Sequence, residues 1–349
     1  MLRVVCRADA SHFLGAGHVM RLLALAFAIR DNGGDVLFLC REHPGNLAKM
    51  IRSHSFKCQL WPCISNDILG ASVAQDAYAT QLAAKDFGAD WIFVDHYGTD
   101  AHWEASQILP VLAIEDLLDR EHACNILLNQ NLGVTKADYV CSASGQTTYL
   151  IGPKYALLGS EFAKFRRKDL SNVRNSKVSE ILLTMGGTDQ PNATGWVLEC
   201  MGNMGIALDF HLTIVMGHTA PHLPAIKRQA ALLPFRTTVL AGTSNMATLM
   251  AQADFAIGAA GSTAWERCAL GLPSIVVTLA DNQQAIASAL QQLGASISID
   301  MKHSKALKKA LRKLLEDAEL RFIMAKKAFE IVDGQGVKRV LSTLQTVRK

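Results

Sequence analysis

Two kinds of hydrophobic pattern alternate along the chain. Short runs that are apolar almost throughout and rich in β-branched residues predict strands buried on both faces of a parallel sheet. Segments with apolar residues at helical spacing lie between these runs, as in residues 17–31. The predicted strands are 2–6, 35–40, 89–95, 110–116 and 124–130 in the first half, and 179–185, 210–216, 235–241, 253–258 and 273–279 in the second. Repeated βαβ units of this kind predict an α/β fold with doubly wound sheets.

The length and a polar segment near the middle predict two domains. A chain of 349 residues is long for a single hydrophobic core. Two Rossmann-like domains are expected to face a cleft at the carboxyl ends of their strands, where ligands of open α/β sheets bind. We expect an N-terminal domain at 1–161, a polar linker at 162–180, a C-terminal domain at 181–316, and a helical segment at 317–349 that can pack back on the first domain.

Composition and charge narrow the class of protein. The chain is 50% hydrophobic and 19% charged, with a net charge of +4, as in an ordinary soluble globular protein. The dense basic segment 302–315 has apolar residues at helical spacing, which favours the solvated face of an amphipathic helix over a nucleic-acid contact. Eight cysteines without CxxC spacing predict neither a disulfide framework nor a zinc site. With no signal-peptide pattern and no apolar stretch of about 18 residues, we expect a cytoplasmic protein without a membrane span.

The stretch "FLGAGHVMR", residues 13–21, places a histidine where a strand gives way to a helix. Gly15 and Gly17 allow the backbone to approach a ligand closely, because neither carries a Cβ atom. His18 is then expected at the mouth of a cleft. The alternative is a histidine at a helix start that faces water.

A second polar group ends the strand at 89–95. In "FVDHYGTD", residues 93–100, Asp95, His96 and Tyr97 follow one another at the carboxyl end of the strand. Polar groups at that edge of a parallel sheet point to a ligand cleft. The alternative is an ordinary turn in which Asp95 caps a local backbone group.

The second half carries its own glycine-containing loop in "ADFAIGAAGSTAWERCALGLPSIVV", residues 253–277. Gly258 and Gly261 permit a tight turn. Ser262 and Thr263 can offer hydroxyl and backbone N–H groups to a phosphate, and Glu266 can accept hydrogen bonds from the hydroxyls of a sugar. The alternative is that the glycines form turns and Ser262 caps a helix. Neither a GxGxxG pattern nor a Walker lysine is present, which argues against a dehydrogenase and a P-loop ATPase.

The order of the motifs resembles one known family. "GAGHVMR", "FVDHYGTD", "AIEDL", "LLNQN", "YALLGSEF", "LLTMGGTDQPN", "GAAGSTAWERCALGLPSIVV" and "LADNQQ" together resemble the UDP-2,4-diacetamido-2,4,6-trideoxy-β-L-altropyranose hydrolases of pseudaminic acid biosynthesis, over residues 1 to about 295. The second half is also similar to the glycosyltransferase that adds N-acetylglucosamine to lipid I. Both families have the glycosyltransferase-B fold, with two Rossmann-like domains.

The resemblance implies a role for each matched residue. His18 is the implied catalytic residue, which acts on a water that attacks the anomeric carbon with inversion, and Tyr97 helps to hold that water. The second domain is implied to bind UDP, with no metal and no cofactor. The implied substrate-binding residues are Gly15, Gly17, Asp95, Gly186, Gly187, Gly261, Ser262, Thr263, Glu266, Asn282 and Gln283.

The chain departs from the family at one position. The family usually has an arginine after "YALL", where this chain has Gly159, so the sugar that it accepts is left open; Lys164, Arg166 and Arg167 are candidate substitutes. Two other functions remain open. One is a glycosyltransferase of the same fold that moves the sugar to an acceptor. The other is a non-catalytic protein that binds nucleotide sugars.

Overall fold

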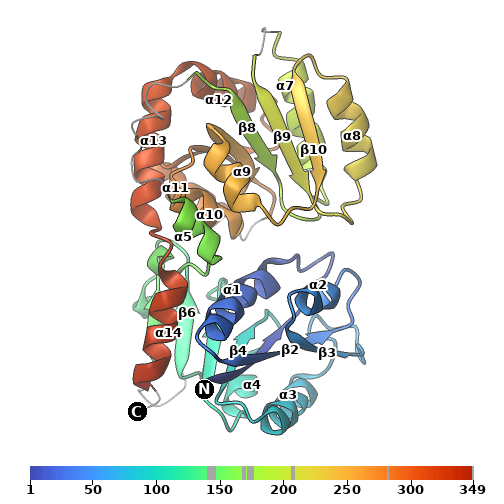
Figure 1. The fold of residues 1–349 in the computed structure, drawn as a ribbon, viewed down its shortest axis with the longest axis vertical. Coiled ribbons are helices and arrows are strands. Elements are labelled where there is room, and N and C mark those ends of the chain that lie inside the picture. The colour runs from blue at the N-terminus through green and yellow to red at the C-terminus, as the bar shows by residue number, and fades with distance from the viewer. Residues whose placement is uncertain (140–146, 167–169, 171–176, 206–208, 281–282, 348–349) are drawn as a thin grey trace. The chain divides into compact units, whose positions relative to one another are not determined.

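The computed structural model describes residues 1–139, 147–166, 170, 177–205, 209–280 and 283–347. The chain divides into two compact units (Figure 1). The first unit contains Met1–Ser160 together with Gln335–Lys349, and the second contains Glu161–Gly334.

The first unit is built on a seven-stranded sheet in the order β3-β2-β1-β4-β5-β6-β7, and every pair is parallel. Its strands are β1 (Arg3–Ala8), β2 (Asp35–Arg41), β3 (Lys57–Trp61), β4 (Trp91–Asp95), β5 (Val111–Ile114), β6 (Ile126–Asn129) and β7 (Thr148–Ile151). Its helices are α1 (Gly17–Asp31), α2 (Ala48–Ser53), α3 (Val73–Phe87), α4 (Ala101–Ala105), the 3₁₀ turns η1 (Lys136–Asp138) and η2 (Pro153–Tyr155), and α14 (Gly336–Val347). Helix α5 (Ser160–Phe165) begins at the boundary between the units.

Alternation along β1 gives this sheet two buried faces. Val4 and Cys6 belong to the core that includes α1 and α14, whereas Val5 belongs to the core on the opposite face, which includes α3. Side chains of a strand point to opposite faces in turn. Because both faces are covered, the strand is apolar at nearly every position, which is the pattern from which it was predicted.

The second unit repeats this plan with a six-stranded parallel sheet in the order β10-β9-β8-β11-β12-β13. Its strands are β8 (Glu180–Thr184), β9 (His211–Met216), β10 (Arg236–Ala241), β11 (Phe255–Ala259), β12 (Ser274–Thr278) and β13 (Ser296–Asp300). Its helices are α7 (Ala193–Gly202), α8 (Leu223–Ala231), α9 (Met246–Gln252), α10 (Thr263–Ala269), α11 (Gln284–Gln292), α12 (Ser304–Glu316) and α13 (Ala318–Ile331). The basic segment forms α12, which buries Leu307, Ala310, Leu311 and Leu314.

These two parallel α/β sheets confirm the predicted fold class, and every predicted strand forms. Strands β3, β7 and β13 form in addition.

The C-terminal segment 317–349 divides between the two units. Helix α13 packs against α10 and α12 in the second unit, and α14 packs against α1 and η2 in the first. The segment 162–180 begins within α5, and its residues 167–169 and 171–176 lie outside the described part of the chain.

Candidate functional site

His18 lies in the first turn of α1, directly after the loop that leaves β1. Gly15 has φ +74°, a left-handed conformation that glycine adopts without a steric cost, and its N–H donates to the carbonyl oxygen of Ser11 at 2.9 Å. This turn leads the chain back into α1. His18 is 3% exposed, so the histidine does not face bulk water as a simple helix-start residue does.

Asp95, the last residue of β4, meets His18 beneath this turn. Its Oδ1 lies 2.6 Å from Nδ1 of His18. Arg21, one turn along α1, donates to both carboxylate oxygens of Asp95, from Nε at 2.9 Å and from Nη2 at 2.8 Å. The Nη1 of Arg21 reaches Asp116 at 2.8 Å. Asp95 is 1% exposed, and the partners that the structure gives it lie within the protein; the substrate contact expected for it stays a prediction.

The charges around Asp95 fix the tautomer of His18. Burial alone raises the pKa of Asp95, but the charge of Arg21 and the contact with His18 outweigh burial and lower the pKa to about 2. An ionised carboxylate only accepts hydrogen bonds, so Nδ1 of His18 carries a proton that it donates to Asp95. Among the described residues no hydrogen bond involves Nε2 of His18, which is therefore the basic nitrogen.

Tyr97 completes this group. Its ring meets the ring of His18 edge to face, with centroids 4.5 Å apart and planes at 85°. The structure thus brings His18 together with Asp95 and Tyr97, which lie far from it in the sequence.

The histidine between Asp95 and Tyr97 belongs to a different cluster. Nδ1 of His96 accepts a hydrogen bond from the N–H of Gly98 at 2.8 Å, so its proton sits on Nε2, which lies 3.2 Å from Oδ2 of Asp9. Burial lowers the pKa of His96, which keeps the ring neutral. Asp9 in turn pairs with Arg7 at 2.8 Å. His96 is therefore part of a buried ion network and not of the group around His18.

In the second unit, two of the predicted loops follow neighbouring strands. Strand β8 ends before Gly186 and Gly187, and β11 ends before Gly261. Gly186 has φ +91°. The carbonyl oxygen of Gly187 accepts a hydrogen bond from the N–H of Gly217 at 2.9 Å, which holds this loop against the end of β9.

Two polar side chains at the start of α10, those of Ser262 and Glu266, have hydrogen-bonding groups that could contact a ligand. Ser262 stands at the cap position of α10, yet its side chain makes no capping hydrogen bond, which removes the alternative that it serves as a side-chain cap. Glu266 is half-buried, and its Oε2 is shielded from solvent without a hydrogen-bond partner in the described part of the chain. Burial raises the pKa of Glu266 to about 7, against the opposing charge of Arg267. A shielded carboxyl oxygen without a partner is suited to accept hydrogen bonds from a ligand.

Two further predicted residues lie after β12. The Oε1 of Gln283 accepts a hydrogen bond from the N–H of Leu279 at 3.1 Å, so this side chain closes its own loop. Asn282 lies outside the described residues.

Arg166, a candidate substitute for the family arginine, is committed to backbone groups. Its Nη1 donates to the carbonyl oxygens of Ala269 at 2.8 Å and of Val332, and its Nη2 donates to that of Phe329 at 2.8 Å. Arg166 therefore ties the end of α5 to the ends of α10 and α13. Arg167 lies outside the described residues, and Lys164 is exposed.

One group in the described residues has the spacing of metal ligands, namely Glu104, His122 and Cys124, all buried. Both ring nitrogens of His122 already face carboxylates, Nδ1 with Glu104 at 2.7 Å and Nε2 with Glu115 at 3.1 Å. Burial opposes the charge of the ring, but these two carboxylates outweigh it and raise the pKa of His122 to about 9. A protonated imidazole offers no lone pair, so the group acts as an ion network.

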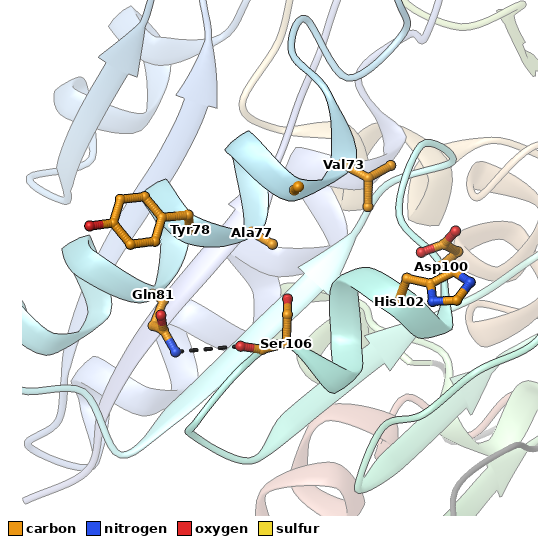
Figure 2. A pocket seen from close by; sticks show the side chains of 8 residues that line it. Val73, Ala77, Tyr78, Gln81, Asp100, His102 and Ser106 are labelled. Atoms are coloured by element: carbon orange, nitrogen blue, oxygen red, sulfur yellow. Dashed lines mark hydrogen bonds between the residues drawn. The ribbon is translucent and has the colours of Figure 1, made fainter.

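A pocket of about 490 Å³ lies between α3 and α4 of the first unit (Figure 2). It is lined by residues such as Val73, Tyr78 and His102, and the side chain of Gln81 donates to the carbonyl oxygen of Ser106 at 3.4 Å across it. None of the residues predicted for catalysis or substrate binding lines this pocket.

Sequence reasoning missed the charged partners of His18. Arg21 stands three residues after His18, and residues three apart lie on the same face of a helix, so the spacing in "HVMR" carried a signal. The sequence signal for Asp116 was weaker: this residue follows β5, which is the neighbour of β4 in the sheet.

The two parallel sheets define the class: this is the glycosyltransferase-B fold. The crystal structure of MurG from Acinetobacter baumannii is similar, with a TM-score of 0.72 at 17% identity, covering 99% of this chain and 100% of that one. Residues 181–341 match the family model of the glycosyltransferase family 28 C-terminal domain. No helix among the described residues is long and apolar enough to cross a membrane.

Particular relatives align along most of the chain. The spore coat polysaccharide biosynthesis protein SpsG of Bacillus subtilis is 28% identical over an alignment of 356 positions. The alignment covers 97% of this chain and 96% of that protein. The UDP-2,4-diacetamido-2,4,6-trideoxy-β-L-altropyranose hydrolase of Campylobacter jejuni is 23% identical over 300 residues, covering 85% of this chain and 98% of that protein.

Proposed function

We propose that this protein is a metal-independent hydrolase of a UDP-activated diacetamido-trideoxy sugar, which releases UDP and the free sugar for nonulosonic acid biosynthesis. The observation that carries the proposal is the pairing of His18 with the ionised Asp95, which leaves Nε2 of His18 as a base. Support comes from the likeness to the Campylobacter jejuni hydrolase, and from the family 28 match of the second half.

In the proposed reaction, Nε2 of His18 takes a proton from a water molecule as that water attacks the anomeric carbon. His18, Arg21, Asp95 and Asp116 carry two carboxylates and one guanidinium, so protonation of His18 brings the group to neutrality. Asp95 is a positioning residue that holds the tautomer and stabilises the imidazolium. Direct attack by water inverts the configuration at the anomeric carbon.

The nucleotide half of the proposal rests on the second unit. Glu266 accepts hydrogen bonds from the ribose hydroxyls, and Gly261, Ser262 and Thr263 contact the diphosphate. UDP is a good leaving group once its diphosphate charge is stabilised, so no second carboxylic acid is needed to protonate it.

The test is incubation with a panel of UDP-sugars, with UDP and free sugar measured together and the anomer identified by proton NMR before mutarotation. We expect His18→Asn to lower turnover by about 10²–10⁴-fold, the usual effect of removing a positioned base, while UDP affinity stays near that of the wild type. The matched control is His102→Asn, because His102 is an exposed histidine on α4. Normal turnover by folded His18→Asn contradicts the proposal.

The family 28 match supports a second candidate, a glycosyltransferase that uses a UDP-sugar donor. The same panel separates the two functions, because a hydrolase releases free sugar in buffer alone, whereas a transferase releases UDP at a useful rate only when an acceptor is added.

A further inference from the structure

Arg267 is a buried cation without a paired anion. The residue lies on α10 and is 1% exposed. Among the described residues it forms no ion pair with a carboxylate; its Nη2 donates to the carbonyl oxygen of Ala259 at 2.8 Å, its Nη1 donates to Oγ1 of Thr263 at 3.2 Å, and its Nε has no partner. Burial lowers the pKa of Arg267 to about 10, so the guanidinium keeps its charge at neutral pH.

The guanidinium bridges the two ends of the loop of residues 260–262. Ala259 ends β11 and Thr263 begins α10, so Arg267 holds the two ends of this loop. A Cβ atom on Gly258 would stand 2.6 Å from Nη1 of Arg267 and 2.9 Å from the carbonyl oxygen of Thr184. The charge therefore sits beside the carboxyl ends of both β11 and β8, the strands that lead into the two glycine-containing loops.

A buried charge without a counter-ion is costly, and proteins usually pair it. The nearest acid in sequence, Glu266, makes no hydrogen bond to Arg267, and its raised pKa leaves it only partly ionised at neutral pH. In the described part of the chain, the charge of Arg267 is thus not balanced by a carboxylate.

We propose that Arg267 is a positioning residue whose buried charge is balanced by the diphosphate of a bound nucleotide, and that it selects ligands carrying this group over the uncharged nucleoside. The inference rests on the nucleotide half of the proposed function. Arg267 does not touch the ligand: it shapes the loop through Ala259 and Thr263 and supplies a positive field in a poorly screened environment.

The experiment compares the affinities of UDP and uridine, by calorimetry and ligand-observed NMR, for wild type and Arg267→Gln. We expect Arg267→Gln to lose UDP affinity by about 10- to 100-fold, at the low end of the coupling of close charge pairs because Arg267 does not contact the ligand, with uridine affinity changed by less than about twofold. The matched control is Arg228→Gln, since Arg228 is exposed on α8. Unchanged UDP affinity, or equal losses for UDP and uridine, overturns the inference.

If Arg267→Gln does not fold, Arg267→Lys tests the inference through the pH dependence of ligand preference. A buried lysine amine titrates at lower pH than a guanidinium, so the preference of Arg267→Lys for UDP over uridine should fall between pH 7 and 9, while that of the wild type stays constant. A constant preference in both proteins contradicts the inference.

Inorganic pyrophosphate separates this inference from the proposed function. If UDP does not bind the wild type, the proposed nucleotide site is wrong, but pyrophosphate should still raise the melting temperature of the wild type and not that of Arg267→Gln. If neither UDP nor pyrophosphate binds the wild type, the charge of Arg267 is not balanced by a diphosphate, and the inference fails.

Discussion

In the proposed function, Glu266 makes nucleotide binding depend on pH. Its carboxyl has a pKa of about 7 because burial disfavours the charged form. Hydroxyl donors bind the carboxylate more strongly than the protonated acid, so protonation below pH 7 should weaken the contact with ribose. We expect UDP affinity to fall by about 10-fold between pH 8 and pH 6, since one proton must leave before binding.

Calorimetry over this pH range tests the dependence on Glu266. UDP itself gains a proton over the same interval, so the informative quantity is the difference between wild type and Glu266→Gln, whose amide does not titrate. If UDP affinity depends on pH in the same way in both proteins, Glu266 does not belong to the nucleotide site.

The site in the first unit shows which contacts a sequence reveals. Carboxyl ends of adjacent parallel strands meet at one edge of a sheet, and this rule predicted that Asp95 and Tyr97 lie near a ligand cleft. Tyr97 does contact the ring of His18, and the ligand cleft beside them stays a prediction. The rule does not give the direction of each of three consecutive side chains. It therefore could not show that His96 faces Asp9 and lies apart from the group around His18. Ion pairing between distant residues leaves no local periodic pattern, so the contact of Asp95 with Arg21, 74 residues away, was missed.

Among the elements, three of the four edge strands were missed, and the fourth, β10, was predicted. The strands that were not predicted, β3, β7 and β13, all stand at sheet edges. An edge strand is covered less completely, so polar residues are tolerated: β3 reads "KCQLW" and none of its residues is fully buried. Central strands such as β4, "WIFVD", are buried at every position and read as continuous apolar runs.

The packing of α3 on β1 depends on a buried ion network. Asp76 on α3 accepts hydrogen bonds from Arg7 at 2.9 Å, from Arg41 at 2.9 Å and from the indole of Trp103 at 3.1 Å. Burial raises the pKa of Asp76, but the charges and hydrogen bonds of Arg7 and Arg41 together outweigh it and lower the pKa, so the carboxylate stays ionised at neutral pH.

We expect Asp76→Asn to lower the free energy of unfolding by about 3–5 kcal/mol, because it leaves two buried guanidinium groups with one carboxylate, that of Asp9. Urea unfolding at pH 7 measures the change. Asp86→Asn on the same helix is the control, since Asp86 is exposed and should change stability by less than about 0.5 kcal/mol. Equal stability of the two variants would mean that the network does not hold α3 in place.

At the scale of the whole molecule, the chain returns to its first unit at the end. Helix α14 follows the entire second unit in sequence, yet Val340 and Leu344 lie in the core that includes α1. Gly336 stands where α14 meets η2, and a Cβ atom there would come within 2.2 Å of the carbonyl oxygen of Ala156. The core of the first unit thus contains residues of α1 and of α14. We therefore expect the stability of α1, which carries His18, to depend on α14.

Leu344→Ala tests this dependence. Leu344 is 2% exposed, and truncation of a buried leucine costs about 2–5 kcal/mol. Hydrogen exchange followed by mass spectrometry should show faster exchange in peptides of α1 and α14, with peptides of α10 and UDP affinity unchanged, because the lost contacts belong to the first unit. Lys338→Ala, an exposed position on the same helix, is the control. Faster exchange in both units to the same extent would mean that they unfold as one cooperative body, and unchanged exchange in α1 would mean that α14 is dispensable for the first unit.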